Sequence, residues 1–211
     1  MDNNIKINCG SLVFFGIKKR LTAVFFAAIM ASIILSALPA YSATLTPRTT
    51  EPNLNNPYYL HTSSGGWNGC LKVNDETVLP NCVGYAWGRA YEIMGKEPSL
   101  SKKDAQVWYG NTGDGYPRGS VPKLGAIMCW TDLADDGSNG YGHIAVVEEI
   151  NSLGQVKYSD SAWGGKRFRY SDHWTLPVVG STTQVSYVYR DDVHRTYTRT
   201  FRGYIYIGKF D

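Results

Sequence analysis

The chain has little net charge, and the excess that it does have lies in its first 42 residues. The whole sequence carries 21 basic and 18 acidic residues, and residues 1–42 hold four of the basic ones and one acidic one. The remainder therefore has 17 charges of each sign and is formally neutral. Nucleic-acid-binding proteins present a basic surface to the phosphate backbone. The composition thus gives no indication of a nucleic-acid partner.

Long apolar runs are also scarce, since the sequence has one, from Leu21 to Leu38. Basic residues 18–20 precede this run, and the small residues Ala40 and Ser42 follow it. This is the pattern of a secretory signal peptide, so we expect cleavage after Ser42 and no stable membrane association afterwards. An uncleaved anchor is the alternative, because about 18 apolar residues can just span a bilayer.

Repeats and low-complexity tracts are absent from the rest of the chain. Residues 43–57 are rich in Thr, Pro and Asn, and we interpret them as a flexible lead-in. Residues 58–211 are enough for one domain with a sizeable core. We therefore expect three parts: a signal peptide over 1–42, the lead-in over 43–57 and a single domain over 58–211.

Cysteine is rare, with four residues in 211. Cys9 belongs to the expected signal peptide, which leaves Cys70, Cys82 and Cys129. An odd number guarantees at least one free thiol unless chains cross-link. Cys129 lies in an apolar stretch and is expected to be buried, whereas a Cys70–Cys82 disulfide is an alternative that would block Cys82.

Cys82 stands at the expected first position of a helix. Asn81 is a good N-cap, Pro80 keeps the helix from starting earlier, and Gly95 ends the helical spacing of apolar residues. A thiol at a helix N-terminus lies at the positive end of the helix dipole, which favours the nucleophilic thiolate. The pattern fits a cysteine hydrolase and a buried structural cysteine about equally.

A histidine on an expected strand, residues 143–150, shifts this balance. His143 and Ala145 would share one face of the strand, and after a turn at 151–154 the chain returns over 156–160. With a four-residue loop, Asp160 lies opposite Ala145, on the face of His143. Cysteine, histidine and aspartate can then act as nucleophile, base and the group that orients the base. Other candidates for the third role are Glu148, Glu149 and Ser161.

Helices are expected in the first half of the domain and strands in the second. Besides the helix at Cys82, we expect a shorter helix from Leu100 to Trp108. The expected strands cover 126–130, 143–150, 156–160, 186–190 and 195–207. Helices followed by an antiparallel sheet indicate the α+β class.

These motifs, taken in order, resemble those of the CHAP domains, which are cysteine, histidine-dependent amidohydrolases and peptidases. The resemblance rests on Asn81-Cys82, Gly142-His143 and Ser159-Asp160-Ser161, and it covers roughly Tyr58 to the C-terminus. It implies a papain-like fold, related to NlpC-type enzymes, in which N-terminal helices carrying the nucleophile pack on an antiparallel β-sheet. Many CHAP domains have Glu at position 160, and Asn where this chain has Ala162.

The resemblance implies a secreted, cell-wall-associated monomer that hydrolyses amide bonds of peptidoglycan through an acyl-enzyme, with Cys82, His143 and Asp160 as its site. The alternative is a non-catalytic cell-wall-binding module that keeps the fold. The three residues favour hydrolysis, because binding alone does not require them. Trp163 and Trp67 are candidates for stacking on sugars or gripping the peptide stem.

No metal or other cofactor is expected. Some CHAP domains hold calcium in the loop before the nucleophile, which corresponds here to Lys72–Pro80. At alternating positions before Cys82 this loop offers Asp75 as its one carboxylate, whereas calcium takes six to eight oxygen ligands. The three aspartates of loop 131–141 are interpreted as part of a solvated surface rather than as a cation site.

Overall fold

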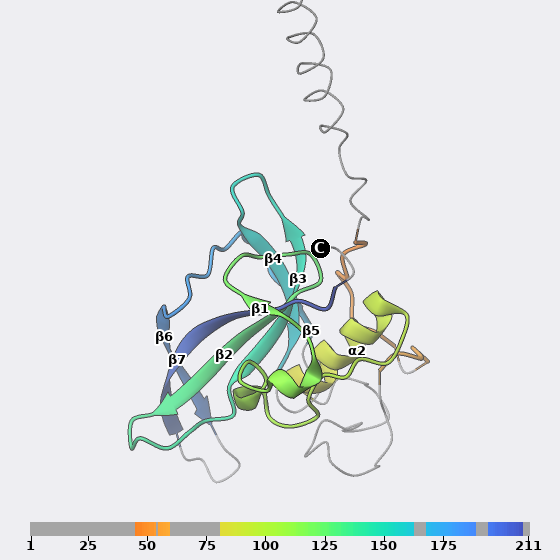
Figure 1. Cartoon of the computed structure of the whole chain (residues 1–211). Coiled ribbons are helices and arrows are strands. Elements are labelled where there is room, and N and C mark those ends of the chain that lie inside the picture. Colours follow the sequence, from red (N-terminus) through yellow and green to blue (C-terminus); the bar gives the residue numbers. More distant parts are fainter. Residues whose placement is uncertain (1–44, 54, 60–80, 163–167, 189–193, 209–211) are drawn as a thin grey trace, which may run out of the picture. The chain divides into compact units, whose positions relative to one another are not determined.

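The computed structural model describes residues 45–53, 55–59, 81–162, 168–188 and 194–208 (Figure 1). Contacts divide the chain into two units, Met1–Ser42 and Ala43–Asp211, and the described residues all belong to the second. Within the described ranges, no helix is both long and apolar enough to cross a membrane. The expected signal peptide, Cys70, Trp67 and Trp163 lie outside these ranges.

Helix α2 runs from Cys82 to Met94, with the start and end that the sequence predicts. The Asn81 side chain accepts a hydrogen bond from the backbone N–H of Gly84 at 3.0 Å, which is the N-cap interaction. Gly95 closes the helix with φ of 68°, a left-handed conformation that suits glycine. The local signals were therefore sufficient to define this helix.

The shorter helix expected over Leu100–Trp108 was wrong in extent. The structure has the 3-10 helix η1 over Ala105–Val107, and a second one, η2, over Thr112–Asp114. The backbone N–H of Gln106 donates to the carbonyl of Tyr141 at 2.8 Å instead of to a preceding turn of its own segment. This tertiary hydrogen bond replaces one that a longer helix would need.

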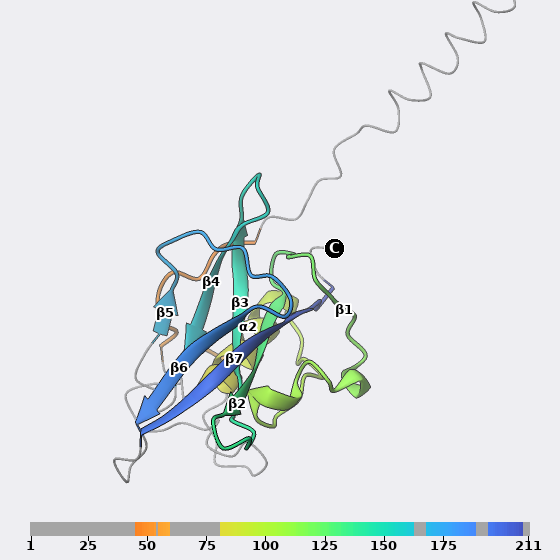
Figure 2. The same cartoon turned by 90° about the vertical axis from the view of Figure 1, so that its left-hand side faces the viewer.

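The remaining elements form one antiparallel sheet in the order β1-β7-β2-β3-β4-β5 (Figures 1 and 2). Strand β1 pairs with residues 204–205 of β7, and β6 pairs with residues 194–200 of the same strand. The expected strands at 126–130, 186–190 and 195–207 had the wrong limits, and β1 and β5 were not expected. The strands are β1 Arg118–Gly119, β2 Ile127–Ala134, β3 His143–Ile150, β4 Val156–Ser161, β5 Phe168–Tyr170, β6 Thr182–Val188 and β7 His194–Ile205.

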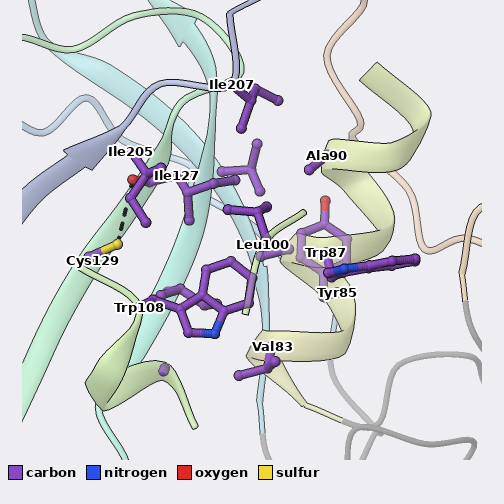
Figure 3. Packing of buried hydrophobic residues seen from close by; sticks show 14 of the residues in the cluster. Val83, Tyr85, Trp87, Ala90, Leu100, Trp108, Ile127, Cys129, Ile205 and Ile207 are labelled. Carbon is purple, nitrogen blue, oxygen red and sulfur yellow. Dashed lines mark hydrogen bonds between the residues drawn. The ribbon is translucent and has the colours of Figure 1, made fainter. Parts of the chain in front are cut away.

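Two apolar clusters lie on opposite faces of the sheet, because successive side chains of a strand alternate in direction. On one face, Ile144 and Val146 of β3 belong to the cluster that includes the buried side of α2. Figure 3 shows Tyr85 and Ala90 of α2 on one side of this cluster and Ile127 of the sheet on the other. The second cluster contains Ala145, Val147, Met128 and Phe201 among others. The described chain is thus mostly antiparallel sheet, with one α-helix packed on it.

The hairpin of β3 and β4 has a five-residue loop, 151–155, rather than the expected four. The pairs Ile150↔Val156 and Glu149↔Lys157 start the ladder, and a bulge between Val147 and Glu149 then shifts the register by one residue. The ladder ends with Val146 paired to Ser159, and this register puts the next residue, Asp160, level with Ala145. The bulge compensates for the extra loop residue and keeps Asp160 on the face of His143.

A buried ion-pair cluster joins α2 to the bulge. Arg89 of α2 donates to both carboxylate oxygens of Glu148, at 2.9 and 2.7 Å, and Ser159 donates to the same carboxylate at 2.6 Å. Two contacts from the segment interpreted as a lead-in reach this cluster: the Thr46 carbonyl accepts from Arg89 at 2.8 Å, and the Arg48 backbone N–H donates to Glu148 at 3.1 Å. These bonds set the position of α2 against β3.

Candidate active site

Cys82 is half-buried at the first position of α2, where the first backbone N–H groups of a helix have no partner within the helix. Its thiol is free, and its interaction with the His143 ring is one of the causes that raise the pKa of that ring. The other described free cysteine, Cys129, is buried in the core on β2, and burial raises the pKa of its thiol. Position therefore distinguishes the half-buried thiol at the helix start from a thiol in the core.

His143 is the first residue of β3, and the glycine before it sets where its ring lies. Gly142 has φ of 70°, and a Cβ there would come within 2.6 Å of the backbone nitrogen of Gln106 and 2.7 Å of the carbonyl oxygen of Trp130. Only glycine allows the chain to pass so closely between η1 and β2. The Trp130 ring also lies beside the imidazole, with 5.7 Å between centroids.

Asp160 of β4 lies next to the imidazole, as the sequence predicts. Its Oδ2 is 2.7 Å from Nε2 of His143, and the two side chains are only 3% and 13% exposed, respectively. Because Nε2 is engaged with Asp160, Nδ1 is the ring nitrogen left to face Cys82. The structure thus brings Cys82, His143 and Asp160 together in one line of contacts.

The surroundings of His143 favour its charged form. Burial lowers its pKa, but hydrogen bonds with Asp160 and Cys82 and the negative charges of both groups outweigh burial and raise the pKa to about 9. Burial likewise raises the pKa of Asp160, yet its bonds to His143 and Arg169 leave it below the ordinary value. At neutral pH the site therefore holds an imidazolium against a carboxylate.

Arg169 is a site neighbour that the sequence did not indicate. This residue of β5 pairs with Asp160 across the strands, and its Nε and Nη2 donate to Oδ1 and Oδ2 of that carboxylate, each at 2.7 Å. A basic residue shortly after Asp160 was the available signal, but β5 has three residues and no predictive pattern. Trp130 was also missed, because its place beside His143 depends on the pairing of β2 with β3.

The alternatives for the third role are engaged elsewhere. Glu148 points to the α2 side of the sheet and binds Arg89, and Glu149 accepts a hydrogen bond from Tyr170. The Ser161 hydroxyl donates to the carbonyl of the next residue at 3.4 Å. The contacts therefore favour Asp160 as the partner of the imidazole.

The expected absence of a metal rests on Lys72–Pro80, which lies outside the described ranges. The aromatic candidates Trp67 and Trp163 lie outside them as well. Within the described ranges, no three His, Cys, Asp or Glu side chains gather as a metal site would require. The expectation about the loop before Cys82 therefore stays a prediction.

Comparison with known proteins finds a family model and several proteins that are similar to part of this chain. The family model for the CHAP domain matches residues 72–162. A Streptococcus mutans protein named as a hydrolase is 34% identical over 92 residues, covering 39% of this chain and 41% of that protein. A Staphylococcus aureus protein named as the autolysin SsaALP is 34% identical over 80 residues, covering 37% of this chain and 28% of its own length.

Among solved structures, an N-acetylmuramoyl-L-alanine amidase from Staphylococcus aureus is 27% identical with a TM-score of 0.33, covering 44% of this chain and 28% of the amidase. The chain spans less than half the length of the curated relatives it matches. All three residues of the line of contacts fall within the matched range. The contact line therefore lies within the segment that matches the CHAP domain family model.

Proposed function

We propose that this protein is a secreted cysteine amidohydrolase or endopeptidase that hydrolyses amide bonds of bacterial cell-wall peptidoglycan, with a papain-like arrangement of its domain. The observation that carries the proposal is the contact line from Cys82 through His143 to the buried Asp160, inside a CHAP domain. The similarity to a protein named as an autolysin supports the choice of substrate. We expect a monomer that acts outside the cell, at the wall.

The reaction begins with the Cys82 sulfur, whose proton is held by His143. The thiolate attacks the amide carbonyl carbon, and a C–S bond forms as the carbonyl oxygen becomes an oxyanion. The backbone N–H of Cys82, at the start of α2, is proposed to stabilise this oxygen. His143 then protonates the leaving nitrogen, the C–N bond breaks, and an acyl-enzyme and a free amine result.

The second half of the reaction returns the enzyme to its starting state. Neutral His143 takes a proton from water, the hydroxide attacks the thioester carbonyl, and the C–S bond breaks to release a carboxylic acid. Asp160 keeps the ring oriented and stabilises the imidazolium each time that it forms. Trp163 and Trp67 are proposed to contact the glycan or peptide around the bond that is cut.

The test is hydrolysis of purified peptidoglycan by the wild type and by Cys82→Ser, with mass spectrometry of the released fragments. We expect the wild type to release fragments with one new amine and one new carboxyl group, and Cys82→Ser to release none while keeping its fold. Cys129→Ala serves as the matched control and should retain hydrolysis, because Cys129 lies in the core.

The fragment masses also identify the bond. A lactyl carboxyl and a free alanine amine indicate an amidase, whereas cleavage inside the stem or cross-bridge indicates an endopeptidase. Undiminished hydrolysis by Cys82→Ser would contradict the mechanism. Binding of the wild type to peptidoglycan without release of fragments would favour the non-catalytic binding module instead.

A further inference from the structure

We propose that Arg169 is a positioning residue of this site, which holds the carboxylate of Asp160 in the plane and orientation that His143 requires. The inference rests on the proposed function and extends it to a residue outside the nucleophile, base and acid. It is also outside residues 72–162, the range that the family model matches.

The contact has the geometry of a bidentate Arg–carboxylate pair. Two parallel N–H groups of Arg169 donate to the two oxygens of Asp160 at 2.7 Å each. Such pairs add geometric specificity to their charge, because the planar guanidinium matches the planar carboxylate. The backbone reinforces the match, since the two residues are direct cross-strand partners of β4 and β5.

The two oxygens of Asp160 have different hydrogen-bond partners. Oδ2 lies 2.7 Å from both His143 and Arg169, while Oδ1 accepts from Nε of Arg169. Rotation of the carboxylate about its Cβ–Cγ bond would therefore break the bond to His143 unless the second oxygen is also held. Arg169 binds this second oxygen. Loss of Arg169 would leave Oδ1 buried without this donor, and a buried ionised group without its donor is costly in free energy.

The strand that carries Arg169 is anchored from its other face. The Phe168 ring packs edge-on against Tyr85 of α2, with 5.7 Å between centroids. Neighbouring side chains of a strand point to opposite faces, so this anchor directs Arg169 to the face of Asp160. The Arg169 side chain stays 53% exposed, whereas that of Asp160 is 3% exposed. The arginine therefore joins a buried carboxylate to the protein surface beside the site.

Arg169 also affects the charge of the site. The titratable groups that face Asp160 are His143 from β3, Arg169 from β5 and Tyr158 from its own strand, with Cys82 of α2 beyond the imidazole. Burial raises the pKa of Asp160, and bonds from His143 and then Arg169 bring it below its ordinary value. Without Arg169, Asp160 takes up a proton at a higher pH, and below that pH it no longer stabilises the imidazolium.

The same sheet contains a matched control. Asp132 of β2 and Arg199 of β7 are also cross-strand partners, with Nε donating to Oδ1 at 2.8 Å and Nη2 donating to Oδ2 at 3.0 Å. This carboxylate is buried as well, and the pair lies on strands that carry neither His143 nor Asp160. Arg199→Met therefore removes an equivalent ion pair while leaving both partners of the His143–Asp160 contact in place.

The experiment compares Arg169→Met, Arg169→Lys and Arg199→Met by kcat, KM, pH profile and thermal unfolding. For Arg169→Met we expect kcat to fall about tenfold, and the acid limb of the profile to move up by about one pH unit, since a neighbouring arginine lowers a carboxyl pKa by about that much. Arg169→Lys keeps the charge but not the two parallel N–H donors. The acid limb of its profile should therefore stay near the wild-type pH while kcat falls. Arg199→Met should lower stability alone.

A readout without substrate separates this inference from the proposed function. The 13C signal of the Asp160 carboxyl, followed through a pH titration, should give a higher midpoint in Arg169→Met than in the wild type, even if peptidoglycan is not the substrate. The proposal is overturned if this midpoint and kcat stay at the wild-type values, or if the two Arg→Met variants change them equally. If Arg169→Met does not fold, the kcat of Arg169→Lys decides, and a wild-type value overturns the proposal.

Discussion

Replacement of Asp160 by asparagine isolates the charge that the buried carboxylate places next to His143. The substitution keeps the size of the side chain and one oxygen, but it removes the negative charge. The His143 ring then stays in a buried position that disfavours its charged form, without the carboxylate charge that helps to offset this burial. We therefore expect the imidazolium to lose its proton at a lower pH.

The size of the effect follows from the pKa of His143, which is raised from an ordinary 6.5 to about 9. This difference corresponds to about 3 kcal/mol in favour of the charged ring, shared between Asp160 and Cys82. If Asp160 supplies half or more of it, turnover at neutral pH should fall by about tenfold to a hundredfold. The raised pKa of His143 contributes stability that is fully present below 6.5 and is lost as pH rises through about 9.

The assay measures kcat/KM on purified peptidoglycan from acid to alkaline pH for the wild type, Asp160→Asn and Asp132→Asn. For the wild type the alkaline limb should lie near pH 9, where His143 loses its proton. In Asp160→Asn this limb should move down by at least about one pH unit, whereas Asp132→Asn, which breaks the equivalent remote pair with Arg199, should leave it in place. An unchanged profile and turnover in Asp160→Asn would refute the role assigned to this carboxylate.

Three further outcomes are expected. Hydrolysis should persist in EDTA and depend on a reducing agent. A loss in EDTA that added calcium restores would contradict the prediction that the loop before Cys82 binds no metal. In urea denaturation, Gly142→Ala should lower the free energy of unfolding by about 1–3 kcal/mol more than Gly137→Ala does. Both glycines have positive φ, but only a Cβ at Gly142 would meet the backbone of Gln106. Equal losses in the two variants would contradict the packing argument. Iodoacetamide should label Cys82 in the folded protein well before Cys129, as peptide mapping will reveal, since Cys129 is 1% exposed.

Features that depend on neighbouring residues along the chain were predictable from sequence. Asn81 as N-cap and Gly95 as stop define α2, because capping and the left-handed conformation are properties of single residues. The limits of β3 agreed with the alternating pattern after Gly142. The contact between His143 and Asp160 was also predicted, although with a four-residue loop between the strands. The contact forms because the bulge at Glu148 compensates for the fifth residue of the actual loop.

Only the tertiary structure decided which other side chains complete the site. Trp130 lies beside His143 because β2 pairs with β3, and Arg169 holds Asp160 because the three-residue β5 pairs with β4. Neither pairing has a local signal. The three-residue β5 carries no periodicity, and the neighbours of β2 are chosen by packing across the sheet. The sequence by itself indicated Cys82, His143 and Asp160 as the proposed nucleophile, base and orienting group, whereas the proposed role of Arg169 depends on a non-local strand pairing.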